Sequence, residues 1–396
     1  MNQEMNINPS EIVSLLKKIL NKEDKPIPLH EPSFTGKEWD YVKDCLDSGF
    51  VSSIGKYVEK FEEKLVQFTG VSYAVATVNG TAALHICLKL IGVEQGDEVL
   101  VPALTFVAAA NAVSYCGAVP HFIDSEIQSL GVDADKLDDY LKEITLIKTG
   151  ICHNKQTMRP VKAVIAMHTF GHPVNLDPLL DVCQKYKLEL IEDAAESLGS
   201  YYKNKHTGNF GKLSALSFNG NKIITTGGGG AILTNDADLA KQAKHISTTA
   251  KLPRRWDFVH DRVGYNYRLP NINAALGCAQ MEQIDKFMRN KRALAEKYRQ
   301  AFNNVQGITF FREPAYARSN YWLNVLLLNE ENVAVRDAIL SETNNQGILT
   351  RPAWVLMNKL TMFQGCPHMD LSMAESLEQR IINIPSSACL GEQYDA

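Results

Sequence analysis

The chain has 396 residues, 45% of them hydrophobic, so it is long enough to bury a large core divided among more than one domain. Its formal net charge of −4 provides no general field for nucleic acid or for an anionic membrane, and we expect neither as a partner. Eight cysteines are scattered without a Cys-x-x-Cys pair, and no secretion signal or membrane span is visible. These features predict a cytoplasmic protein whose cysteines are mostly small core residues.

The N-terminal residues 1–25 contain a short run with helical periodicity. Charged residues interrupt its apolar positions, which are Ile12, Leu15, Leu16, Ile19 and Leu20. The run is short and lacks the aromatic residues that favour a membrane interface. We therefore expect an amphipathic helix that packs on its own protein.

Apolar strands alternate with helical stretches between about residue 71 and residue 235. The segments 98–101, 119–124, 163–167 and 188–192 are typical of strands, and 176–187 is typical of a helix. This alternation predicts an α/β fold with a mostly parallel sheet covered by helices on both faces, which we assign to a large domain at residues 26–272. Ligands of such sheets collect at the carboxyl ends of the strands, where Gly80, Phe106, His168 and Asp193 fall.

A smaller C-terminal domain is expected at residues 273–396. It begins with a long connecting helix, which carries Lys291, Arg292 and Lys297 on a solvated face. The segments 308–311 and 322–328 then indicate strands, and 333–342 indicates a helix. The pattern is that of a small α+β domain.

Lys222 ends the segment Ser217-Phe218-Asn219-Gly220-Asn221-Lys222 and precedes four glycines at 227–230. A lysine held in a crowded turn after a strand can become a neutral amine, which Schiff-base chemistry with a carbonyl cofactor requires. Taken alone, the segment also fits a surface lysine beside a glycine-rich turn. It does not match the phosphate loop of nucleoside-triphosphate enzymes, because here the lysine precedes the glycines.

Three further segments add weight to Lys222. Asp193 follows the apolar strand at 188–192, where an aspartate can bind the protonated ring nitrogen of pyridoxal phosphate or simply cap a helix. Gly80 and Thr81 open a helix after the strand at 73–78, and a helix start offers free N–H groups to a phosphate. Phe106 follows another strand and is placed either to stack on a planar cofactor or to join the core.

In order and spacing these segments resemble the fold-type I pyridoxal-phosphate enzymes and, within them, the sugar aminotransferases of the DegT type. The resemblance covers nearly the whole chain and rests on residues 79–84, 105–106, 168–171, 193–196, 217–222 and 264–268. It implies a fold-type I large domain with a mixed, mostly parallel sheet. It also implies that Lys222 binds pyridoxal 5′-phosphate covalently, that Asp193 pairs with the ring nitrogen and that Phe106 packs on the ring.

The same resemblance implies how the phosphate is held. Gly80, Thr81 and Ser217 would bind it from one subunit, and Asn266 or Arg268 would reach it from the other subunit of a homodimer. An apolar N-terminal helix, which needs a surface to cover it, also favours a dimer with shared active sites.

Glu196 departs from the family pattern. Many members carry His or Gln three residues after the aspartate, whereas an ionised glutamate only accepts hydrogen bonds and is an awkward neighbour for the phenolate oxygen of the cofactor. It is either protonated or turned away, and we keep it among the cofactor-binding residues. The resemblance also places His168 near the cofactor. We expect no metal site, because Gly171 and Pro173 disfavour a helical pair of ligands at His168 and His172.

The substrate is expected to be a nucleotide-linked keto sugar, with L-glutamate as amino donor. The segments 51–58, 193–199, 219–222, 319–322 and 351–354 look most like the LegC-type branch of the family, which aminates the 4-keto group of a UDP-linked 6-deoxy-N-acetylhexosamine in legionaminic acid and bacillosamine synthesis. Apolar faces for sugar and base, and charge for a diphosphate or the donor carboxylate, are offered by Tyr321, Trp322, Trp354, Arg351 and Lys56.

Three alternatives stay open. The nucleotide could be GDP or dTDP, because nothing in these residues distinguishes one base from another. The keto group could also lie at C3. A pyridoxal-phosphate enzyme acting on amino acids alone would share Lys222 and Asp193, and Arg351 is the candidate for binding an α-carboxylate. A non-catalytic regulator on the same fold would need neither the lysine nor the aspartate.

Overall fold

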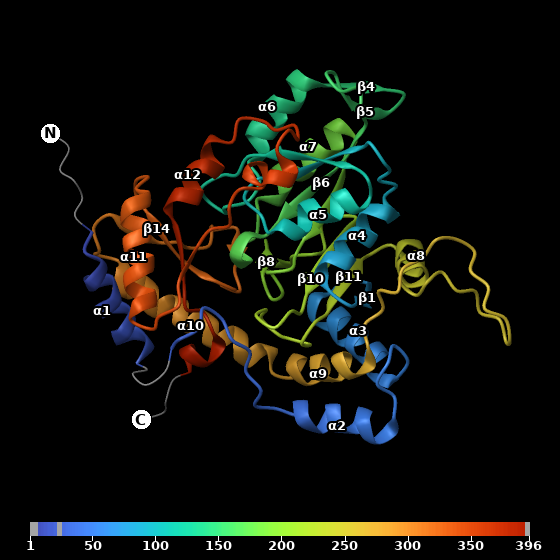
Figure 1. Ribbon diagram of the computed structural model, residues 1–396, viewed down its shortest axis with the longest axis horizontal. Coiled ribbons are helices and arrows are strands. Elements are labelled where there is room, and N and C mark those ends of the chain that lie inside the picture. Colours follow the sequence, from blue (N-terminus) through green and yellow to red (C-terminus); the bar gives the residue numbers. More distant parts are fainter. Residues whose placement is uncertain (1–6, 22–25, 393–396) are drawn as a thin grey trace.

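The computed structural model describes residues 7–21 and 26–392, and Figure 1 shows that they form a larger α/β part beside a smaller part. The larger part is built on a seven-stranded sheet with the strand order β1-β11-β10-β7-β6-β2-β3. These strands are β1 (Tyr73–Thr77), β2 (Glu98–Pro102), β3 (Val119–Ile123), β6 (Val161–Met167), β7 (Glu189–Asp193), β10 (Leu213–Ser217) and β11 (Gly230–Thr234).

Five of these strands, from β10 to β3, run parallel to one another, and this confirms the predicted sheet. β11 is the exception, since it runs antiparallel to both β1 and β10. The reason lies in the connection at residues 218–229, which contains no helix, whereas a parallel return requires a long crossover. The sheet is therefore mixed, and this helix-free connection carries Lys222.

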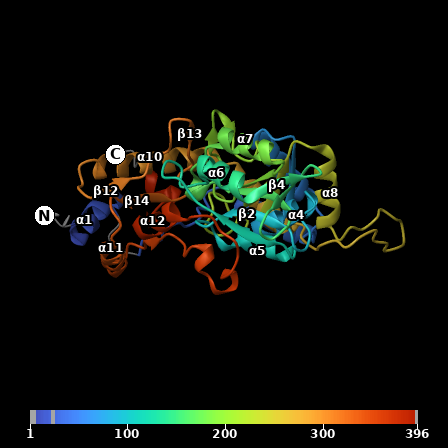
Figure 2. The same cartoon turned by 90° about the horizontal axis from the view of Figure 1, so that it is seen from above.

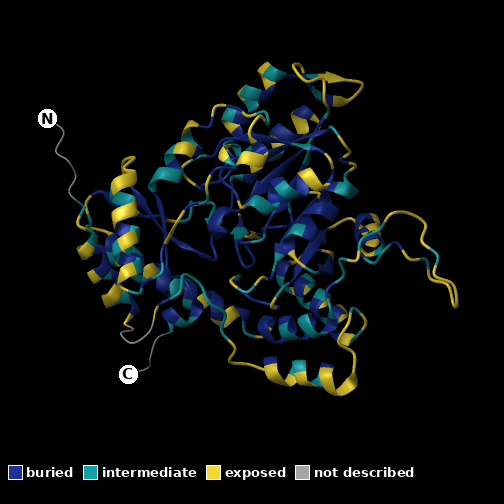
Figure 3. Cartoon of the chain, in the orientation of Figure 1, coloured by how far each residue is buried: buried dark blue, intermediate teal, exposed yellow. Residues whose placement is uncertain are grey.

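Helices cover the sheet, and its strands are almost wholly buried (Figure 3). The helices of the larger part are α2 (Glu38–Ser48), α3 (Lys56–Thr69), α4 (Gly80–Leu90), α5 (Val107–Tyr115), α6 (Ala134–Ile144), α7 (Leu176–Tyr186) and α8 (Ala237–Ser247). The remaining short elements are β4 (Thr145–Lys148), which forms a hairpin with β5 (Ile151–Asn154), the small sheet of β8 (Tyr201–Tyr202), β9 (Lys205–His206) and β13 (Ala317–Arg318), and the 3₁₀ turn η1 (Thr169–Gly171).

The predicted connecting helix is divided in two, and its Lys291 is fully buried, so the predicted solvated position of this residue was wrong. α9 (Asn271–Met281) packs against α2 and α3 of the larger part, whereas α10 (Ile284–Phe302) continues to the smaller part. The break falls where the helix changes its packing partners. The side chains of Gln280 and Gln283, on either side of the break, both donate to Glu38 Oε1, at 2.6 and 2.5 Å.

The smaller part contains an antiparallel sheet in the order β12-β14-β16-β15. Its strands are β12 (Ile308–Phe310), β14 (Asn324–Leu328), β15 (Arg351–Pro352) and β16 (Ile381–Ile384), its helices are α11 (Val333–Asn345) and α12 (Ser372–Arg380), and its 3₁₀ turns are η2 (Met357–Lys359), η3 (Thr361–Phe363) and η4 (Ala388–Gly391).

The N-terminal helix α1 (Pro9–Leu20) joins this smaller part (Figure 2). Its buried residues Ile12 and Leu16 share one apolar core with Tyr298 of α10 and Leu326 of β14. The helix thus packs on its own protein, as expected. Its apolar face is covered within the subunit, so the argument that it needs a second subunit was wrong.

None of the helices in the described ranges is long and apolar enough to cross a membrane.

Candidate active site

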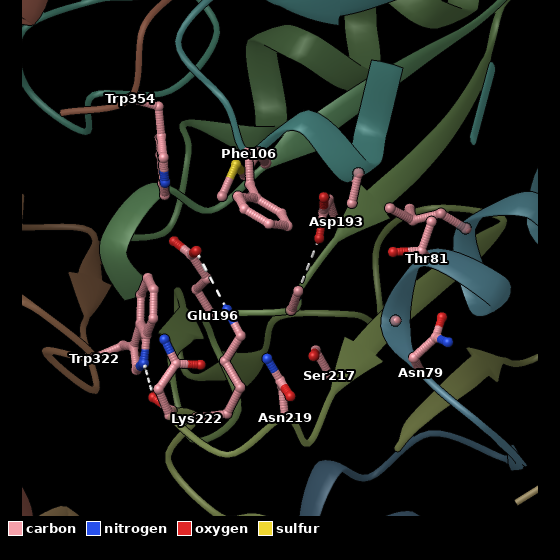
Figure 4. Close-up of a pocket in the computed structure, with 16 residues that line it drawn as sticks. Asn79, Thr81, Phe106, Asp193, Glu196, Ser217, Asn219, Lys222, Trp322 and Trp354 are labelled. Atoms are coloured by element: carbon pink, nitrogen blue, oxygen red, sulfur yellow. Dashed lines mark hydrogen bonds and ion pairs between the residues drawn. The ribbon is translucent and has the colours of Figure 1, made fainter. Parts of the chain in front are cut away.

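A cavity of about 290 Å³ lies at the carboxyl edge of the parallel strands. It collects side chains from the loops after β1, β2, β7 and β10 and from the smaller part of the molecule (Figure 4). The residues that line it are Asn79, Gly80, Thr81, Leu84, Phe106, Ala108, Met167, Asp193, Ala195, Glu196, Ser217, Asn219, Asn221, Lys222, Trp322 and Trp354. Most of the predicted cofactor-binding residues therefore meet in one place.

Lys222 projects into this cavity from the connection between β10 and β11. Its side chain is only 13% exposed, and Nζ lies 3.3 Å from Glu196 Oε1. The ammonium also lies 3.9 Å from the centre of a Trp322 ring, a cation–π contact. Trp322 is itself held by its indole N–H, which donates to the carbonyl of Asn221 at 2.7 Å. The lysine is thus confined between a carboxylate and an aromatic wall.

Two buried carboxylates face the same space. Burial raises the pKa of Asp193 above its ordinary value, although the N–H of Ala195 donates to Oδ1 at 3.2 Å and Lys222 lies nearby. Burial also raises the pKa of Glu196, to about 7, against the opposing attraction of Lys222. Glu196 Oε2 accepts from the N–H of Phe170 at 2.9 Å, so the carboxyl group is fixed toward the cavity. Of the two alternatives for Glu196, protonated or turned away from the cofactor, the second does not hold in this structure, because Glu196 lines the cavity.

The first turn of α4 closes one end of the cavity. Asn79 caps the helix by accepting from the N–H of Ala82 at 2.7 Å, and the N–H groups of Gly80 and Thr81 have no acceptor within the helix. A Cβ added to Gly80 would stand 3.0 Å from the Cβ of Ser217, so the two segments approach as closely as a glycine permits. The helix start and Ser217 therefore form a tight cup suited to an anion.

Aromatic rings form the rest of the wall. Phe106 is 48% exposed at the start of α5, so its ring is available to a ligand and is not part of the core. Trp354 lies 6.4 Å from Phe106 and stacks on Phe170 at 4.8 Å, measured between ring centres. Figure 4 shows Trp322 and Trp354 at the end of the cavity opposite Asn79 and Thr81.

Some predicted substrate contacts are not in the cavity. His168 is fully buried, its Nε2 lies 3.0 Å from Glu192 Oε2 and its Nδ1 accepts from the N–H of Val174, so the structure does not bring it to the cavity and its contact with a ligand stays a prediction. Tyr321 is turned away and packs against His172 and Phe310, so the structure does not bring it to the cavity either, and its contact stays a prediction. Its backbone takes a positive φ of 48°, and the next residue, Trp322, lines the cavity.

Arg351 and Lys56 also lie outside the cavity. Arg351 lines a second, adjoining cavity instead. Lys56 is an exposed side chain at the start of α3 and forms an ion pair with Asp44 at 2.9 Å. Within one subunit, Lys56 therefore does not meet the predicted ligand.

Asn266 and Arg268 do not line the cavity of their own subunit either. Both belong to the segment that follows the projecting residues 251–263, and Asn266 is exposed. Their predicted role requires a second subunit and stays a prediction. No cluster of histidine, cysteine, aspartate or glutamate suited to a metal ion occurs in the part of the chain that the structure describes.

Several lining residues escaped the sequence analysis. Met167 closes β6, and Asn219 and Asn221 lie in the connection that carries Lys222. The two asparagines were within a motif already singled out, and their alternate positions, 219 and 221, just before Lys222 were a usable signal. Met167 had no local signal, because an apolar residue at a strand end looks like core.

These residues fit pyridoxal 5′-phosphate. A cup for a phosphate at the start of α4, an aromatic ring at Phe106, a buried carboxylate at Asp193 and an amine at Lys222 are the four contacts that this planar cofactor needs. Such a constellation on a mostly parallel sheet is that of a pyridoxal-phosphate enzyme of fold type I.

Comparison with known proteins specifies the family. Residues 32–394 match the DegT/DnrJ/EryC1/StrS aminotransferase family, and the chain belongs to it. GDP-perosamine synthase of Escherichia coli O157:H7 is 36% identical over 93% of this chain and 95% of its own length. GDP-perosamine synthase of Vibrio cholerae is 37% identical over 91% of this chain and 94% of its own.

The fold also matches that of solved family members. The Helicobacter pylori aminotransferase PseC, involved in the biosynthesis of pseudoaminic acid, superposes with a TM-score of 0.83 at 25% identity, covering 92% of this chain and 94% of that one. The predicted DegT-type family, fold and cofactor are confirmed. These comparisons establish the family but not the LegC-type branch within it, since two of the similar proteins are GDP-perosamine synthases.

Proposed function

We propose that this protein transfers the amino group of L-glutamate to a nucleotide-linked keto sugar. The observation that carries the proposal is the position of Lys222, whose Nζ lies 3.3 Å from Glu196 in the cavity that also contains Asp193 and the start of α4. A regulator without catalysis has no use for an amine confined in this way. We further propose that it works in the cytoplasm.

Each residue has a part in the transfer. Pyridoxal phosphate supplies an electron sink when bound. Lys222 would anchor it and, as a free amine, would accept the proton from the donor carbon. Asp193 would hold the ring nitrogen protonated, because a positive charge on that nitrogen would favour the ionised carboxylate that burial alone opposes. Glu196, with its pKa raised to about 7, can present a proton near the lysine at neutral pH.

The finer substrate in this proposal is a UDP-linked 4-keto-6-deoxy-N-acetylhexosamine, which would become a 4-amino sugar. Its support is the resemblance of the segments around Lys56, Glu196 and Arg351 to LegC-type enzymes. Two aromatic walls, Trp322 and Trp354, provide apolar faces of the kind that pack on a sugar ring.

A GDP-linked 4-keto sugar is the second candidate. Relatives named GDP-perosamine synthase, at 36% and 37% identity over most of the chain, favour it. The two candidates differ in the base and in the substituents of the sugar, so one substrate panel separates them.

We also propose a homodimer with shared active sites. Large apolar side chains are strongly exposed on α2 and the loop after it, for example Trp39 at 79% and Ile54 at 70%. Two more, Trp256 and Phe258, are each 78% exposed on the projecting residues 251–263 (Figure 1). Apolar exposure of this extent favours a partner surface. In a dimer Asn266 or Arg268 would reach the phosphate of the other subunit, and Lys56 would lie near its ligand.

The test is a panel of UDP-, GDP- and dTDP-linked 4-keto sugars, each incubated with the holoenzyme and glutamate and analysed for the amino sugar by mass spectrometry. We expect amination of the UDP-linked N-acetyl sugar above the others. A preference for the GDP-linked sugar would replace the first candidate by the second. Amination of a 3-keto sugar only, or of no nucleotide sugar, would overturn the proposal.

A further inference from the structure

A second cavity of about 410 Å³ adjoins the active site and shares three of its wall residues, Asn221, Trp322 and Trp354. Its other polar walls are His30, from the segment before α2, and Arg351 and Asn383, from β15 and β16. The two cavities therefore lie side by side, with Trp322 and Trp354 between them.

His30 has no hydrogen-bond partner in the described part of the chain. Both of its ring nitrogens are buried, and neither is paired. The backbone around it is firmly placed, because Leu29 O accepts from the N–H of Ser386 at 2.7 Å and the N–H of Glu31 donates to Ser387 Oγ at 2.9 Å. Buried polar groups without a partner are rare in folded proteins and costly, and a ligand is one way to satisfy them.

The surroundings keep this histidine neutral. Burial lowers the pKa of His30 well below its ordinary value, and the positive charges of Lys291 and Lys222 lower it further. A neutral imidazole offers one N–H donor and one acceptor. His30 lines the cavity that shares Asn221 and Trp322 with the cavity of Lys222.

Asn383 supplies the complementary group on another wall. Its Nδ2 donates to the carbonyl of Pro352 at 3.2 Å, which leaves Oδ1 as an acceptor that is buried and unpaired. Arg351 is exposed at the rim, where its guanidinium donates to Asn344 Oδ1 at 3.3 Å. The interior of the cavity thus presents one neutral donor, the N–H of His30, and neutral acceptors on His30 and Asn383, between apolar walls. A carboxylate would satisfy His30 but would face the carbonyl oxygen of Asn383 without a proton to offer.

We propose that this cavity is a subsite for an acylamino substituent of the keto sugar, with His30 donating to its carbonyl oxygen and Asn383 accepting from its N–H. The acyl methyl group would lie on the apolar walls. The inference rests on the proposed function and deepens it, because it assigns the choice between an acylamino and a hydroxyl sugar to two named side chains.

The experiment uses the holoenzyme and two 4-keto-6-deoxy sugars on the nucleotide that the wild type accepts, one with an acylamino group and one with a hydroxyl at the same carbon. We expect His30→Ala to lower kcat/KM for the acylamino sugar by roughly tenfold, the size of one good hydrogen bond, with less than about twofold loss for the hydroxyl sugar. His30→Gln, which keeps a donor, should recover part of the loss. His153→Ala, at a histidine on β5 in the distant hairpin, serves as control.

A second measurement tests whether His30 also affects the reaction with the amino donor. The half-reaction with glutamate alone, followed by the change in cofactor absorbance, should be unchanged in His30→Ala. Equal loss on both sugars, or an equal loss in the glutamate half-reaction, would overturn the subsite and leave the proposed function standing. Failure of the wild type to aminate any keto sugar would overturn both.

Discussion

Glu196 is a buried carboxylate whose pKa is raised to about 7 while it lies 3.3 Å from the ammonium of Lys222. Two effects oppose each other there. Burial disfavours the ionised form, and the lysine favours it, but burial is the larger cause. The position that seemed awkward for an ionised glutamate therefore suits a carboxyl group that exchanges its proton near neutral pH.

This raised pKa predicts a pH dependence of stability in the cofactor-free protein. The folded-state pKa lies above the ordinary value of 4.5, so the stabilising contribution is complete below about pH 4.5 and is lost as the pH rises through about 7. Glutamine does not titrate. The melting temperature of Glu196→Gln should therefore fall less over this pH range than the melting temperature of the wild type.

The matched control is Glu189→Gln, since Glu189 is a half-exposed carboxylate on β7 that pairs with Lys212 at the surface. Its melting curve should follow the wild type in its dependence on pH. If the melting temperatures of Glu196→Gln and wild type changed equally from pH 4.5 to 8, burial would not be what raises the pKa of Glu196.

At the scale of elements, the start of α4 is packed closely against β10. A Cβ added to Gly80 would stand 3.3 Å from the carbonyl oxygen of Leu216 and 3.0 Å from the Cβ of Ser217, so helix and strand would have to move apart by a few tenths of an ångström. The phosphate cup thus depends on the distance between a helix and a strand.

We predict that Gly80→Ala weakens cofactor binding while the protein still folds. Pushing α4 away from Ser217 by a few tenths of an ångström should cost roughly tenfold in the dissociation constant of pyridoxal phosphate, measured by absorbance titration of the apoprotein. Gly220→Ala is the control, since a Cβ there meets nothing within 4 Å. Unchanged affinity in Gly80→Ala would show that the phosphate does not sit in this cup.

Local sequence motifs were enough to place some residues of the site but not others. Lys222, Asp193 and Gly80 lie at or shortly after strand ends in contiguous motifs, and a local pattern is enough to place them at one edge of a sheet. His168 also follows a strand end, but its ring turns to Glu192, a buried carboxylate 24 residues away in sequence on the neighbouring strand. Tyr321 and Trp322 are neighbours in sequence, yet only Trp322 lines the cavity, and no local pattern distinguishes the two.

Longer-range features had even less local signal. The antiparallel direction of β11 follows from a helix-free connection, and the break between α9 and α10 follows from a change of packing partner. His30 lies in a segment without regular structure before α2, and its place beside the active site depends on the contacts of its neighbours with residues 386–387. Such approaches arise from tertiary packing and leave no periodicity in the sequence.

At the scale of the whole molecule, the proposed dimer predicts complementation between inactive variants. Each shared site takes Lys222 from one subunit and Arg268 from the other. In a mixed dimer of Lys222→Ala and Arg268→Ala, one site therefore lacks both residues and the other site has both. After exchange of equal amounts, random pairing should restore about a quarter of wild-type activity. The measurement is the initial rate of amination before and after exchange.

A second mixture provides the control. Lys222→Ala combined with Asp193→Asn should stay inactive, because both residues serve the cavity of their own subunit. Absence of rescue in the first mixture, with each variant dead alone and exchange verified, would contradict a role for Arg268. The same mixture with Asn266→Ala then tests the other residue of the predicted pair.

The four tryptophans of this chain fall into two pairs with different surroundings. Trp322 and Trp354 line the active site, whereas Trp39 and Trp256 are each nearly four-fifths exposed on the surfaces assigned to the dimer. Indole emission depends on the polarity around the ring. The intrinsic fluorescence of the unlabelled protein therefore carries two separable signals, one that responds to an occupant of the site and one that responds to dilution of the subunits.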